Sequence, residues 1–114
     1  MSFLAVASQK SLFILQRNQL QYEQTLIMST ANRVTRQMSD YANEANRRAE
    51  EEGGTVDLDS DAYYIDLQRT EEFLEARQDA LDSQINLLDN EINTMGTMVN
   101  NNIKSSCTLN LIGG

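Results

Sequence analysis

The sequence predicts an all-α protein, a long antiparallel two-helix hairpin with coiled-coil-like packing and a short extended C-terminal tail. Leucine or methionine recurs at every seventh position from Leu67 to Met95. No proline interrupts the 114 residues, so long continuous helices are allowed. Four of the five glycines form pairs at 53–54 and 113–114, which leaves one internal break. Together these observations favour two helices joined once.

The first helix is expected over residues 1–52. Phe13, Leu20, Ile27, Val34 and Tyr41 lie seven residues apart, and this spacing places them on one face of a helix. A second stripe of apolar residues lies beside this face and consists of Leu4, Leu12, Leu15, Tyr22 and Leu26. Two stripes form a wider apolar surface than one partner helix can cover.

Residues 53–59 are expected to form a polar turn, and residues 60–106 the second helix. Gly53 and Gly54 are helix-stop residues, and Asp59 or Ser60 is the expected N-cap. A fold about residue 55 places Met38 and Tyr41 opposite the polar region of Glu71 and Gln78. The same register brings the densely apolar sequence near both termini together.

The two helices are predicted to meet along a seam within the chain. Its heptad leucines at d and β-branched residues at a are typical of helices that need a partner helix. The expected seam residues are Leu20, Ile27, Ala31, Val34, Met38, Leu67, Leu74, Leu81, Ile85, Leu88, Ile92, Met95 and Val99.

Charge supports this pairing, because residues 1–48 carry a net charge of +3 and residues 49–114 a net charge of −11. A basic helix beside an acidic one favours contact within the hairpin and discourages the second helix from pairing with itself. Arg33, Arg36, Arg47 and Arg48 form a small basic cluster. We expect these arginines to pair with carboxylates of the acidic second helix. Binding to nucleic acid is disfavoured, since the same carboxylates would repel its phosphates.

Residues 107–114 are expected to form an apolar extended tail, because apolar and polar residues alternate there. A frayed terminus is the alternative. We expect the tail to dock on a neighbouring subunit. The candidate assembly surface therefore combines the second stripe with the tail: Leu4, Leu12, Leu15, Tyr22, Leu26, Leu109, Leu111 and Ile112.

Several function classes are disfavoured by composition. The chain has no histidine, so a serine or cysteine nucleophile lacks its ordinary base, and neither an enzyme nor a cofactor is expected. A metal site is not expected either, because the acidic run from Asp57 to Asp61 lacks the glycine and glutamate of a calcium loop, and Cys107 is the single cysteine. No apolar run is long enough to cross a membrane. Without a signal-peptide pattern, we expect cytoplasmic synthesis, with export by a signal-less route left open.

In outline the chain is similar to the needle proteins of type III secretion systems and to small coiled-coil export and chaperone components. The shared features are about 100 residues, two helices, a polar turn and apolar termini. Needle subunits usually have a proline-containing loop, and WXG100 hairpins a tryptophan-glycine turn, where this chain has Gly53-Gly54. The first hypothesis is a structural subunit that assembles with copies of itself, in a filament, tube or secretion-type apparatus. The alternative is a coiled-coil adaptor or export-chaperone-like protein that binds another protein.

Overall fold

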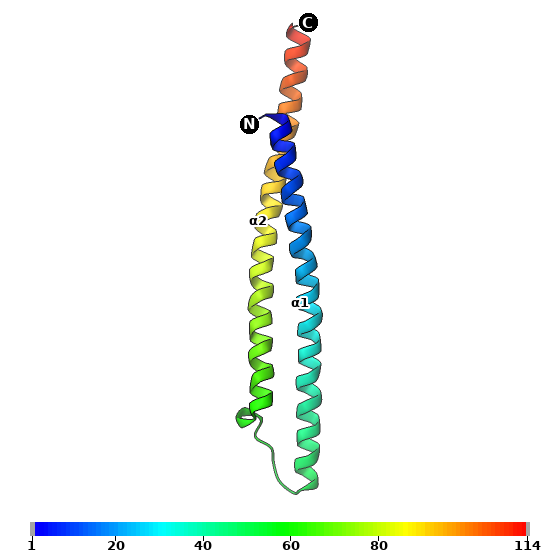
Figure 1. The fold of residues 1–114 in the computed structure, drawn as a ribbon, viewed down its shortest axis with the longest axis vertical. Coiled ribbons are helices and arrows are strands. Elements are labelled where there is room, and N and C mark those ends of the chain that lie inside the picture. Colours follow the sequence, from blue (N-terminus) through cyan, green and yellow to red (C-terminus); the bar gives the residue numbers. More distant parts are fainter. Residues whose placement is uncertain (1, 114) are drawn as a thin grey trace. The chain divides into compact units, whose positions relative to one another are not determined.

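The computed structural model describes the backbone of residues 2–113 and the side chains of residues 2–104. It contains a long helix α1 (Phe3–Glu51), a short 3-10 helix η1 (Leu58–Ser60) and a second long helix α2 (Ala62–Gly113). The two long helices run antiparallel and pack against each other as a hairpin (Figure 1), and no strand occurs in residues 2–113. The predicted all-α hairpin is therefore confirmed.

The glycine pair ends α1 as expected. Gly53 has a φ of +73°, a left-handed conformation that glycine adopts without steric cost. The Gly53 N–H donates to the Glu50 carbonyl at 3.1 Å, and the Gly54 N–H donates to the Ala49 carbonyl at 2.8 Å. These two bonds form a Schellman motif, which satisfies carbonyl groups that the end of a helix leaves without partners.

The start of α2 differs from the expectation. Neither Asp59 nor Ser60 caps it, because η1 includes both residues. The cap is Asp61, whose Oδ1 accepts a hydrogen bond of 3.0 Å from the Tyr64 N–H. Asp57 instead caps η1, with its carboxylate bound to the Asp59 N–H and the Ser60 hydroxyl. The chain contains several Asp and Ser residues in a row, so composition alone could not choose among them.

The C-terminal end of α2 is also corrected. The helix continues to Gly113, whereas an extended segment was expected over residues 107–114. No proline or glycine interrupts residues 97–112, and Ile103, Cys107 and Leu111 also recur at a helical spacing of four. The alternation of apolar and polar residues over 107–112 was too short to distinguish a strand from a helix. The side chains of Cys107, Leu109, Leu111 and Ile112 lie outside the described residues, so the docking of this segment stays a prediction.

The chain divides into two compact units. The loop unit, Glu23–Ala80, holds the second half of α1, the loop and the first half of α2. Its core consists of Val34, Leu67 and Leu74, and the half-buried Ile27, Ala31 and Met38 pack against them. Heptad positions of both helices therefore meet here.

The terminal unit combines Met1–Tyr22 with Leu81–Gly114. Val6 and Leu81 are completely buried in it, and Ile85 and Ile92 are nearly so. These residues continue the heptad positions of their helices, which explains why they are the ones removed from water.

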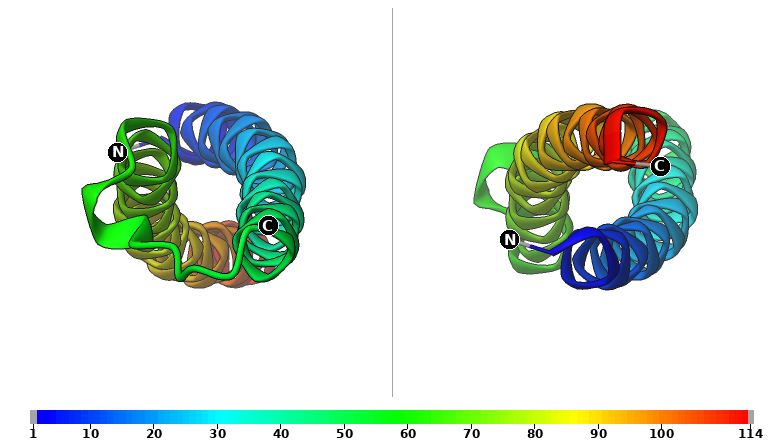
Figure 2. Two further views of the ribbon diagram at one scale, coloured as in Figure 1. Left: turned by 90° about the horizontal axis from the view of Figure 1, so that it is seen from below. Right: turned by 90° about the horizontal axis from the view of Figure 1, so that it is seen from above.

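The register of the loop unit differs from a simple fold about residue 55. Tyr41 bonds to Asp61, and Glu71 accepts a hydrogen bond from Thr35. The last turns of α1 thus extend beyond the start of α2, and the loop runs back along them before α2 begins (Figures 1 and 2). The long path of the loop, and not a tight turn at Gly53-Gly54, sets which residues oppose each other.

Candidate assembly surface

The structure buries the predicted seam to a varying degree. Val34, Leu67, Leu74, Leu81, Ile85 and Ile92 are buried. The remaining predicted residues are half-buried: Leu20, Ile27, Ala31, Met38, Leu88, Met95 and Val99. Two facing helices leave the flanks of their seam partly open to water, which explains why these seam residues are only half-buried.

Within residues 2–104, each unit has an ion pair that joins the two helices. In the terminal unit, Arg17 Nη1 lies 3.2 Å from Asp89 Oδ1. In the loop unit, Arg77 Nη2 lies 2.7 Å from Glu23 Oε1. The cation belongs to α1 in the first pair and to α2 in the second. Each pair is partly exposed, so its main effect is on register and orientation, with only about 0.2–1 kcal/mol of stability.

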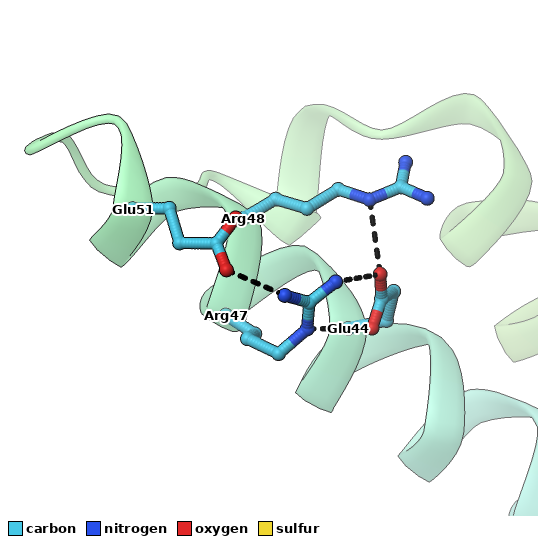
Figure 3. Close-up of polar contacts among 4 residues, drawn as sticks. All are labelled: Glu44, Arg47, Arg48 and Glu51. Atoms are coloured by element: carbon cyan, nitrogen blue, oxygen red, sulfur yellow. Dashed lines mark hydrogen bonds and ion pairs between the residues drawn. The ribbon is translucent and has the colours of Figure 1, made fainter.

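Arg47 and Arg48, two of the four arginines of the predicted basic cluster, bind carboxylates of their own helix and not the carboxylates of α2 as expected. Arg47 donates two hydrogen bonds to Glu44, at 2.6 and 3.0 Å, and one to Glu51 at 2.6 Å. Arg48 Nε donates to the same Glu44 at 3.0 Å (Figure 3). The spacings of three and four residues place all four side chains on neighbouring turns of α1. The bidentate Arg47 lowers the pKa of the Glu44 carboxyl to about 2, and Arg48 adds to the effect.

Tyr41, Asp61 and Tyr63 form a contact at the loop end that the sequence reasoning missed. The Tyr41 hydroxyl donates to Asp61 Oδ2 at 2.6 Å, and the Tyr41 and Tyr63 rings lie 4.7 Å apart. This bond raises the pKa of Tyr41 and, with the Tyr64 N–H, lowers the pKa of Asp61. The sequence feature that could have indicated this contact is Tyr41 itself, because an aromatic residue with a hydroxyl group on the core face of a helix needs a hydrogen-bond partner.

The second stripe is exposed. In the terminal unit the exposed fractions are 73% for Leu4, 46% for Leu12, 55% for Leu15 and 68% for Tyr22. Leu26, in the loop unit, is 50% exposed. Leu15 and Tyr22 lie about 200° around α1 from Phe13 and Leu20, respectively. Leu15 and Tyr22 are therefore on the far side of the helix from the seam, not beside it as expected, whereas Leu12 and Leu26 lie only about 100° from Phe13 and Ile27.

The structure also exposes apolar residues of α2 that were not predicted to be part of an assembly surface. Phe73 and Leu87 are 69% and 65% exposed. They stand 14 residues apart at the same heptad position, so a search for a second periodic stripe on α2 would have found them.

Within residues 2–104, no group of three or more acidic or cysteine side chains is arranged to hold a metal ion. Neither long helix, over its described part, has a stretch apolar enough to cross a membrane. Comparisons with protein-family models, curated proteins and solved structures found no match to this chain.

Proposed function

We propose that this chain is a structural subunit that assembles with copies of itself through its apolar terminal half. The observation that carries the proposal is the second stripe, whose Leu4, Leu12, Leu15 and Tyr22 are exposed in the terminal unit. Fully burying such a side chain contributes about 1.5–3 kcal/mol, so several of them in a row favour association.

A catalytic role has less support. The perturbed carboxyl groups, Glu44 and Asp61, are held by Arg47 and by Tyr41 in bonds that leave them charged. A general acid or base needs a pKa near the working pH, and these shifts move away from it. We therefore favour self-assembly over catalysis. The assembly that we propose is a filament, a tube or a secretion-type apparatus.

Sedimentation of the purified full chain over a range of concentrations, with electron microscopy of the same samples, tests the proposal. Dimers or larger homopolymers are expected. A chain that stays monomeric at every concentration, and binds only a different protein, would instead be an adaptor.

Matched variants locate the contact. Leu12→Gln with Leu15→Gln should reduce self-association, because both side chains belong to the terminal unit. Met28→Gln with Phe73→Gln is the control, because these side chains are similarly exposed but belong to the loop unit. Equal loss of association in both double variants would contradict a contact through the terminal half.

A further inference from the structure

We infer that α1 pairs with α1 of a second copy of this chain, in antiparallel orientation, through an outer seam formed by Leu12, Leu15, Gln19 and Tyr22. This inference rests on the proposed self-assembly and names the surface, the partner and the orientation. All four side chains are exposed and belong to the terminal unit.

The spacing of the outer seam supports a helix as its partner. Its residues are separated by three, four and three positions, which is the repeat of a coiled-coil seam. The same intervals are read in either direction along the helix. Two antiparallel copies therefore bring Leu12 opposite Tyr22 of the second copy, and Leu15 opposite Gln19 of the second copy. Such self-complementary contact is what a two-fold symmetric dimer requires.

The charge around the outer seam favours α1 over α2 as the partner. Residues 11–32 contain only two charged side chains, Arg17 and Glu23. Both are bonded across the hairpin, to Asp89 and Arg77, respectively. The outer seam is therefore an uncharged surface that matches a copy of itself.

In the terminal unit, the exposed apolar residue Leu87 of α2 has a carboxylate beside it. Glu91 lies one turn after Leu87 on the same side of the helix and is exposed. Packing this side of α2 on an uncharged helix would remove the carboxylate from water without giving it a cation, which costs free energy. A second α1 avoids this cost.

The antiparallel orientation follows from Arg33 and Arg36. They continue the outer seam along the same continuous helix at the same alternation of three and four residues. A parallel pair would place each arginine beside its own counterpart. An antiparallel pair centred near residue 17 separates the two copies of Arg33 by about 48 Å along the helix axis, well beyond the screening length of salt.

Distances between spin labels test the pairing. The full chain with Cys107→Ser would carry one added cysteine, either Gln16→Cys or Asn32→Cys, both at exposed polar positions of α1. An antiparallel pair centred near residue 17 predicts a distance below about 20 Å between labels at position 16, and about 45 Å between labels at position 32. Short distances at both positions would show a parallel pair, and long distances at both would show a different surface. Either result overturns the inference.

A matched pair of variants gives a second measurement. Leu15→Gln removes one apolar residue from the outer seam and should raise the dimer dissociation constant at least about ten-fold. Leu87→Gln makes the same change at a comparably exposed residue of α2 in the same unit, and should leave the constant unchanged.

The outcome separates this inference from the proposed function. If the unlabelled chain self-associates but position 16 gives no short distance, α1 pairing fails and self-assembly stands. If the chain sediments as a monomer at every concentration, both fail.

Discussion

The Tyr41 hydroxyl donates a hydrogen bond of 2.6 Å to the Asp61 carboxylate, which at the same time caps the N-terminus of α2. The Asp61 carboxylate thus joins the C-terminal part of α1 to the first turn of α2. Both contacts stabilise the charged form of Asp61, so its pKa lies below the ordinary value of 3.8.

Tyr41→Phe should raise the pKa of Asp61, because it removes the hydroxyl donor and keeps the aromatic ring. A carboxyl with a lowered folded-state pKa stabilises the fold above its unfolded pKa and loses this effect as pH falls through the folded pKa. Acid unfolding should therefore begin at a higher pH in this variant. Carboxyl-carbon NMR titration and circular dichroism measure the two effects. Tyr63→Phe is the control and should leave the Asp61 pKa unchanged.

Arg47→Gln should raise the pKa of Glu44 from about 2 toward its ordinary value of 4.5. Arg47 donates two hydrogen bonds to Glu44 and Arg48 only one, so Arg48→Gln should have a smaller effect. In the unaltered chain, the stabilising contribution of ionised Glu44 is complete above pH 4.5 and is lost as pH falls through about 2. An NMR titration of the Glu44 carboxyl in the three proteins checks the order. An equal shift in both variants would contradict the dominant role of Arg47.

Gly53→Ala should lower the free energy of unfolding by about 1 kcal/mol, because the φ of +73° is unfavourable for a residue with a Cβ atom. Gly54→Ala is the matched control. Its added Cβ meets no atom within 4 Å and its φ is not in the left-handed region, so the change should be below about 0.5 kcal/mol. Urea denaturation followed by circular dichroism gives both values. A smaller effect at position 53 than at 54 would contradict the role of the Schellman motif.

Leu81→Ala should destabilise the hairpin by about 2–5 kcal/mol, because this completely buried side chain would leave a cavity. Leu87→Ala changes an exposed residue six positions later and should have little effect on unfolding of the monomer. Urea denaturation at low protein concentration keeps self-association out of the comparison. Similar losses in the two variants would show that Leu81 is not a core residue in solution.

The sequence by itself determined the hairpin. Most of the buried residues were also expected from the heptads, but Val6, which is completely buried, was not. The heptad repeat from Leu67 to Met95 requires a partner helix, and the absence of proline allows long helices. Gly53-Gly54 is the only internal glycine pair, so the position where α1 ends could also be predicted. These features depend on local spacing and backbone preference, which a single sequence displays directly.

The candidate assembly surface was only partly predictable. The members of the second stripe followed from their apolar character and spacing. The place of Leu15 and Tyr22 on the far side of α1 depends on which face the partner helix covers, and in the terminal unit that face contains Val6, which is completely buried.

The tertiary structure alone decided the register and the polar contacts. Asp57, Asp59, Ser60 and Asp61 are all chemically able to cap a helix, and the path of the loop selected Asp61 for α2. Arg47 had acidic candidates on both helices, and the nearby Glu44 and Glu51 on its own helix bind it. Such choices among equivalent partners depend on distances in space, because charge and hydrogen bonding act between groups wherever the fold brings them together.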